Sequence, residues 1–194
     1  LAYWDSQWRI RTAGQLDSPA LRQIPRSILA SQAAEPVDPL AAAQWRRALR
    51  AAQDFTGLLR ERDVPLLAGS DTPFGALAPG LSLWRELALL AEAGLSPMQA
   101  LRAATSDAAR RLGQPQLGRL RPGAPADLVL LRDNPLAEIP ERPAITAVIR
   151  QGTLYRPAEL LTAGTADTAA EPDPWDKQFA LRQIKSLSEN LVTP

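Results

Sequence analysis

The chain has 194 residues, contains neither cysteine nor histidine, and carries a net charge of +1 because 22 basic residues nearly balance 21 acidic ones. This balance provides no overall attraction to nucleic acid or to an anionic membrane, and the lack of cysteine excludes disulfides, thiolate metal sites and thiol nucleophiles. The lack of histidine removes the commonest metal ligand and the usual general base near neutral pH. The sequence has no run of about 18 apolar residues, so we expect no membrane span; the cytoplasm and the periplasm or secretion stay open as alternatives.

Residues 1–40 are expected to form an irregular lead-in, because their apolar residues follow no sustained period. One short helix is predicted from Ser18 to Ile24, where serine followed by Pro19 is typical of a cap and a first-turn proline. The chain begins at Leu1 rather than methionine, so we expect its start to be processed or truncated.

A long helix is predicted to begin at Asp38, which together with Pro39 supplies a cap and a first-turn proline. Apolar residues then recur at steps of three and four and form one stripe: Trp45, Leu49, Ala52, Phe55 and Leu59. The arginines of this helix lie mostly off the stripe and alternate with acidic residues. A solvated face is therefore favoured over a phosphate-binding or membrane-binding surface.

Asp71 has the most informative position in the sequence. It follows an apolar run at residues 64–67 that is expected to be a buried strand, and it precedes a loop at residues 74–80 that is expected to face a substrate. In strand-then-helix architectures, ligands and catalytic groups collect where such a strand ends. From this position alone, a turn residue or helix cap is favoured over a catalytic carboxylate.

Three helices are predicted after this loop, over residues 82–93, 96–104 and 108–112. Ser96 and Gln99 have the spacing of a capping box at the start of the second helix. Small alanines in the last two helices indicate close helix packing, which is a structural role.

The helical period ends at Gly113, and short strands are predicted beyond it. Residues 117–120 and 126–131 are expected to form a hairpin or a pair of adjacent strands around a Pro-Gly turn. Residues 147–150 and 153–155 are expected to form a second pair around a glycine turn. Three or four short strands make a small β-unit.

Asp127 lies at the start of one of these strands, where a cap for turn amides is favoured over a ligand. Residues 162–174 are rich in small residues and predict a linker. The apolar spacing in residues 175–194 predicts an amphipathic C-terminal helix that docks on this chain or on a partner.

Three motifs, in this order, carry a family resemblance: "VPLLAGSDTPFG", "LSLWRELALLAEAGLSPMQALRAATSDAARRLG" and "LGRLRPGAPADLVLLRDNPLAEI…ITAVIRQGTLY". Over about residues 41–156 the chain resembles the C-terminal portion of the metal-dependent amidohydrolase superfamily, in the branch of imidazolonepropionase-like and Xaa-Pro-dipeptidase-like enzymes. The resemblance implies an α/β fold. Residues 41–113 would form the last βα unit of a (β/α)8 TIM-like barrel, and residues 114–161 the C-terminal part of a small β-sandwich, followed by the linker and the helical extension.

The resemblance implies hydrolysis of a carbon–nitrogen bond in an amide or cyclic amide. Asp71 matches the family's aspartate, which is a metal ligand and the proton acceptor for the hydrolytic water, and Thr72 and Phe74 are expected to contact the substrate. The complete site is expected to hold a divalent metal, with zinc as the expected ion. This chain alone is expected to hold none, because the family's His-x-His pair and two later histidines have no counterpart here, and Trp84 stands where many relatives have histidine.

The expected partners are the missing N-terminal portion, or a companion chain that carries the histidine ligands, together with a small-molecule amide substrate. Nucleic acid is not expected, and an oligomer is an open alternative. Two other functions remain as alternatives: a catalytically inactive structural or regulatory subunit, and an unrelated helical binding module that uses residues 175–194.

Overall fold

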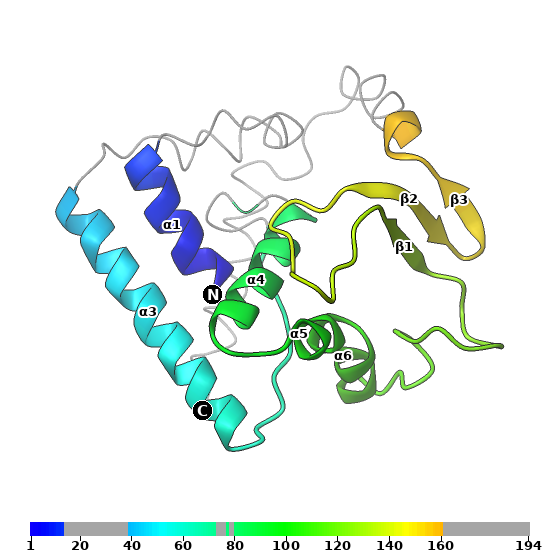
Figure 1. Cartoon of the computed structure of the whole chain (residues 1–194), viewed down its shortest axis with the longest axis horizontal. Coiled ribbons are helices and arrows are strands. Elements are labelled where there is room, and N and C mark those ends of the chain that lie inside the picture. The colour runs from blue at the N-terminus through cyan, green and yellow to red at the C-terminus, as the bar shows by residue number, and fades with distance from the viewer. Residues whose placement is uncertain (14–38, 73–76, 78–79, 161–194) are drawn as a thin grey trace, which may run out of the picture.

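The computed structural model describes residues 1–13, 39–72, 77 and 80–160. In chain order its elements are α1 (Ala2–Ala13), α3 (Pro39–Glu61), α4 (Leu81–Glu92), α5 (Pro97–Ala104), α6 (Ser106–Arg111), β1 (Leu128–Leu131), β2 (Ile145–Arg150) and β3 (Thr153–Tyr155). The helices gather on one side of the molecule and the three strands on the other, with α4, α5 and α6 between the α1–α3 pair and the sheet (Figure 1). Within these ranges, every helix is too short or too polar to span a bilayer.

Helix α1 corrects the expectation of an irregular lead-in. Residues Ala2–Ala13 are helical although their apolar residues follow no sustained period. Tertiary contacts outweigh local propensity here, since the rings of Tyr3 and Trp4 pack on Trp45 of α3 at centroid distances of 5.9 and 5.2 Å. The helix predicted for residues 18–24 lies outside the described residues.

Helix α3 confirms the long helix predicted after Asp38. It lies alongside α1 (Figure 1), and Leu49 of its apolar stripe is buried in a cluster with residues of α1 and α4. Phe55 and Leu58, farther along the helix, remain exposed. Only part of the apolar surface of α3 is therefore covered by the described residues.

Residues 64–72, which we call the Asp71 segment, correct the expectation of a buried strand. They belong to no ladder in the described part of the chain. Burial alternates from Leu66 to Thr72, as in an extended chain: Leu66 packs against the core of α4 and α5, whereas Leu67 is 44% exposed. The segment is packed on one side only because no described strand lies beside it.

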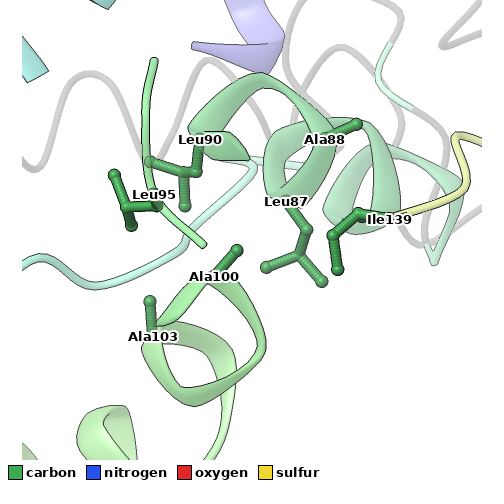
Figure 2. Close-up of a cluster of buried hydrophobic side chains, with 7 residues drawn as sticks. All are labelled: Leu87, Ala88, Leu90, Leu95, Ala100, Ala103 and Ile139. Carbon is green, nitrogen blue, oxygen red and sulfur yellow. The ribbon is translucent and has the colours of Figure 1, made fainter. Parts of the chain in front are cut away.

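The main hydrophobic core joins α4 and α5, and Figure 2 shows its seven side chains: Leu87, Ala88, Leu90, Leu95, Ala100, Ala103 and Ile139. Helix α5 begins with the predicted capping box, in which Ser96 Oγ accepts from the Gln99 amide and Gln99 Oε1 accepts from the Ser96 amide. Ala100 and Ala103 are fully or almost fully buried, so their small side chains allow α5 to pack closely on α4. This confirms the predicted packing role of the alanines.

The described strands form one antiparallel sheet in the order β1-β2-β3. Strands β2 and β3 confirm the predicted second pair, and both turn residues, Gln151 and Gly152, have positive φ, as a tight hairpin turn requires. Leu130 and Leu154 on one face, and Val129 and Tyr155 on the other, remain exposed. The sheet therefore presents apolar side chains on both faces.

The hairpin predicted between residues 117–120 and 126–131 is wrong, because β1 pairs with β2. Residues 117–120 form a bend and irregular structure instead. Gly118 lies against the junction of α5 and α6, where an added Cβ would come within 2.5 Å of the Thr105 carbonyl carbon. Packing on the helices thus holds this segment away from the sheet.

Candidate active site

Asp71 lies at the end of the Asp71 segment with an exposed side chain and a φ of 54°. This left-handed conformation is uncommon for a residue with a side chain, and aspartate and asparagine adopt it more readily than most. The backbone geometry therefore fits the turn interpretation of Asp71, while its exposure leaves the carboxylate free for chemistry. The observed conformation and exposure of Asp71 therefore agree both with a turn residue and with a catalytic carboxylate.

The two residues that flank Asp71 are joined to each other. Ser70 Oγ and Thr72 Oγ1 share a hydrogen bond of 2.8 Å. Both residues are half-buried, whereas Asp71 between them is exposed. Phe74, the other residue expected to contact a substrate, lies outside the described residues.

A complete metal centre does not form within the described residues, where no group of three or more histidine, cysteine, aspartate or glutamate side chains comes together. Catalytic metal sites generally use about three protein ligands and keep one position open. The carboxylate of Asp71 has the right chemistry for one such ligand. The described residues can therefore supply one ligand of a metal site but not a complete set of ligands.

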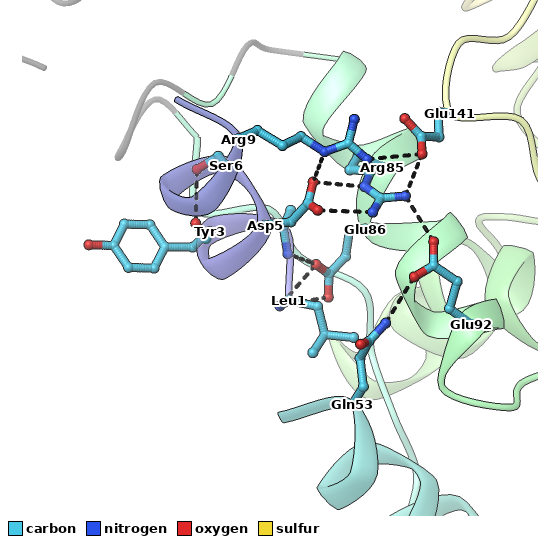
Figure 3. A network of polar contacts seen from close by, with 11 residues as sticks. Leu1, Tyr3, Asp5, Ser6, Arg9, Gln53, Arg85, Glu86, Glu92 and Glu141 are labelled. Carbon is cyan, nitrogen blue, oxygen red and sulfur yellow. Dashed lines mark hydrogen bonds and ion pairs between the residues drawn. The ribbon is translucent and has the colours of Figure 1, made fainter. Parts of the chain in front are cut away.

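A network of charged side chains fixes α1 on α4 (Figure 3). Arg85 donates two hydrogen bonds to Asp5, at 2.8 and 2.9 Å, and also contacts Glu92 and Glu141. Asp5 is only 2% exposed and forms a second ion pair with Arg9. Three segments of the chain, namely α1, α4 and the loop that carries Glu141, thus meet at one guanidinium and its carboxylate partners.

The electrostatics of Arg85 follow from these contacts. Burial alone would lower the pKa of its guanidinium, but the hydrogen bond and charge of Asp5, with the charges of Glu92 and Glu141, outweigh burial and raise the pKa above its ordinary value. Arg85 therefore stays charged, and Asp5 is buried with a fixed cation beside it. Buried carboxylates are rarely found without such a partner.

Glu86, the next residue on α4, is buried and holds the first residues of α1. Its carboxylate accepts a hydrogen bond from the Ala2 amide and lies 3.1 Å from the Leu1 nitrogen. The same end of α1 covers Leu77, which is 4% exposed and lies in the loop after Asp71. Arg85 and Glu86 together therefore position α1 against Leu77.

Sequence reasoning missed this network. The only signal in the sequence is the Arg85-Glu86 pair inside an otherwise apolar helix. Asp5 is 80 residues away, so no local pattern joins it to Arg85.

Asp127 acts as the expected cap. Its carboxylate accepts a hydrogen bond of 2.7 Å from the Gln151 amide and forms an ion pair with Arg150. Two contacts lower the pKa of the Asp127 carboxyl: the hydrogen bond from the Gln151 amide has the larger effect, and the contact with Arg150 has the smaller one. Asp127 thus holds the β2–β3 turn against the start of β1.

A family model described as "Amidohydrolase family" matches residues 20–155. The chain belongs to the amidohydrolase family, which confirms the resemblance read from its motifs and the α/β class. Metal binding is characteristic of this family. Membership also overturns the alternative of an unrelated helical binding module.

Two curated relatives show the level of similarity. Over 99 residues the chain is 36% identical to ochratoxinase of Aspergillus niger, a match that covers 48% of this chain and 20% of the relative. Over 73 residues it is 47% identical to imidazolonepropionase of Anaeromyxobacter sp. (strain K), covering 37% of this chain and 17% of the relative. The matched part of the chain spans about a fifth of these relatives.

Solved structures show the same fold. An amidohydrolase crystal structure matches with a TM-score of 0.50 and 25% identity over 68% of this chain and 32% of that chain. A Xaa-Pro dipeptidase, solved with methionine bound in its active site, matches with a TM-score of 0.51 and 23% identity over 66% of this chain and 32% of that chain. The second match supports the fold alone.

Proposed function

We propose that this chain is the C-terminal part of a metal-dependent hydrolase that cleaves a carbon–nitrogen bond in an amide or cyclic amide. One observation carries the proposal: in a chain of the amidohydrolase family, the exposed carboxylate of Asp71 ends a segment that is packed on one side only. One structural neighbour, 27% identical and covering 76% of this chain, is a "putative prolidase from Bifidobacterium longum". The histidine ligands come from a missing N-terminal portion or from a companion chain, since this sequence has none.

In this proposal, residues 41–113 are the last βα unit of a (β/α)8 barrel, and the Asp71 segment, which belongs to no ladder among the described residues, pairs as a strand only when the rest of the barrel is present. The exposure of Val64 and Leu67 supports the placement, because a neighbouring barrel strand would cover them. Residues 114–161 belong to a small β-sandwich, which fits a sheet with apolar side chains on both faces. Residues 1–40 are assigned to the lead-in, and the predicted linker at residues 162–174 and helical extension at residues 175–194 lie outside the described residues.

Asp71 performs the proton transfer. Its carboxylate accepts a proton from the attacking water and returns it to the leaving nitrogen, so that the amide bond breaks without expelling an unprotonated amine anion. A divalent metal, with zinc expected, lowers the pKa of the water that it binds to about 7 when the site is complete. Thr72 and Phe74, which follow Asp71 in the sequence, are the residues proposed to contact the substrate.

The test separates a catalytic Asp71 from a turn residue. Asparagine and glycine both tolerate the left-handed backbone, so Asp71→Asn and Asp71→Gly keep the turn and remove the proton acceptor. We expect kcat/KM of the assembled enzyme on a Xaa-Pro dipeptide or a cyclic amide to fall by about 10²–10⁴-fold in both variants.

Asp63 offers a matched control, because it is also exposed and also has a positive φ, of 53°. Asp63→Asn is expected to retain full activity. If Asp71→Asn and Asp71→Gly are as active as Asp63→Asn, Asp71 is a turn residue and the catalytic proposal is wrong. That result would favour the catalytically inactive structural or regulatory subunit, the alternative that the histidine-free sequence supports.

A further inference from the structure

The hydrogen bond between Ser70 and Thr72 spans Asp71. Ser70 and Thr72 are both half-buried, whereas the carboxylate of the residue between them is exposed. The oxygens are 2.8 Å apart, a normal distance between hydroxyl partners. The bond therefore joins the two neighbours of a residue that has left-handed backbone.

Such a bond restrains the backbone dihedrals of the residue that it spans. The direction of the Asp71 side chain depends on φ and ψ of that residue, and these angles also set the separation of its two neighbours. Left-handed φ is unfavourable for a residue with a Cβ and needs support from its surroundings. The Ser70–Thr72 hydrogen bond is the described contact placed to provide that support.

The upstream side of this bond is anchored to the helical core. The Ala68 amide donates a hydrogen bond of 3.0 Å to the Ala103 carbonyl of α5, and Ala68 packs against the α4–α5 core. Ser70 therefore follows a fixed point of the chain at a distance of two residues. The hydrogen bond from the Ser70 hydroxyl then restrains the position of Thr72, the residue after Asp71.

We propose that Ser70 and Thr72 are positioning residues, whose shared hydrogen bond holds Asp71 in its left-handed conformation and aims its carboxylate. This inference rests on the proposed function, because it supposes that the carboxylate acts on the hydrolytic water. It also assigns the Thr72 hydroxyl to Ser70 rather than to the substrate. Loss of positioning lowers kcat, whereas loss of a substrate contact raises KM.

Three variants test the proposal. Thr72→Val removes the Thr72 hydroxyl at nearly constant volume, and Ser70→Ala removes its hydrogen-bond partner. Thr72→Ser keeps a hydroxyl at position 72 and so keeps the bond. Thr56→Val is the matched control, because Thr56 is a partly buried threonine whose hydroxyl bonds the Ala52 carbonyl within α3. The first readout needs no activity: φ-dependent NMR couplings and the 13C shifts of residue 71 in this chain. The second is kcat and KM of the assembled enzyme on a Xaa-Pro dipeptide.

We expect Thr72→Val and Ser70→Ala to shift residue 71 away from the left-handed signature and to lower kcat about fivefold, with KM within about twofold of wild type, because one hydrogen bond is lost. Thr72→Ser and Thr56→Val should match wild type. Unchanged couplings in both hydroxyl-deleted variants would overturn the proposal whatever the activity, and so would a rise in KM at constant kcat.

Failure of the proposed function gives a different pattern. If Asp71→Asn retains full activity, the catalytic role is lost and the positioning role with it, even where the couplings respond as expected. If Asp71→Asn abolishes activity while Thr72→Val and Ser70→Ala keep a normal kcat, the proposed function stands and the positioning role is wrong.

Discussion

The helical core and the open half of this molecule differ in how well each buries its apolar side chains. In the helical core, formed by α1, α4 and α5, apolar side chains are buried and Asp5 lies beside two arginines. In the open half, formed by the Asp71 segment and the β1–β3 sheet, Leu67 and Leu154 are exposed. The apolar side chains left exposed in the open half indicate where further polypeptide packs.

The largest expected effect tests this difference with leucines. Leu89 of α4 is 0% exposed, and we expect Leu89→Ala to lower the free energy of unfolding by roughly 3–5 kcal/mol through lost burial and a cavity. Leu67→Ala should change it by less than about 0.5 kcal/mol in this chain. Urea denaturation of both variants measures the contrast, and similar losses at the two positions would show that the open half is as well packed as the core.

Gly118 tests how the segment that precedes the sheet is held against the junction of α5 and α6. In Gly118→Ala, the new Cβ meets the backbone of Thr105 and the left-handed backbone disfavours alanine, so we expect a loss of about 3 kcal/mol. Gly123 also has a positive φ but nothing within 4 Å of an added Cβ, so Gly123→Ala should lose only about 1 kcal/mol. Equal losses would mean that Gly118 is not packed against α5 and α6.

The buried charge pair sharpens the description of the core. Asp5→Ala removes the bidentate partner of Arg85, and we expect about 2 kcal/mol of destabilisation, limited because Glu92 and Glu141 still contact the guanidinium. A double-mutant cycle between Asp5 and Arg85 measures the coupling. The exposed Arg102–Asp107 pair is the matched control, and its coupling should stay below about 1 kcal/mol. Equal couplings would remove the distinction between the two pairs.

The smallest effect concerns the exposed carboxylate of Asp127 in the sheet. Its pKa is lowered by the Gln151 amide and Arg150, so its contribution to stability is present above the pKa of the unfolded chain and is lost as pH falls through the lower folded value. Asp127→Asn should therefore flatten the acid side of the stability profile slightly. An NMR titration of Asp127 that gives a pKa at or above about 3.9 would contradict this.

The elements that sequence alone predicts are those whose signals are local. Helix α5 was predictable because Ser96 and Gln99 form a capping box within four residues, and the β2–β3 turn because of its glycine. Helix α1 was missed because its stability comes from contacts with α3 and α4, which no local pattern contains. The predicted buried strand failed for the converse reason, since the apolar run at residues 64–67 lacks a neighbouring strand in the described part of the chain.

The same division applies to the candidate site. The position of Asp71 after an apolar run was readable from the sequence, and so was the family. Its left-handed backbone and the hydrogen bond between its neighbours depend on how the chain turns after Ala68 is fixed to α5. The pairing of Asp5 with Arg85 needed the folded arrangement, because 80 residues separate them.

The most direct test of the central claim is a crystal structure of the assembled enzyme with its divalent metal, located by anomalous scattering at the metal's absorption edge. The account predicts a metal bound by histidines from outside this chain, with a carboxylate oxygen of Asp71 at about 2.0–2.2 Å if the ion is zinc. A fully occupied metal site with Asp71 outside the coordination sphere, and no bound water within its reach, would contradict the account.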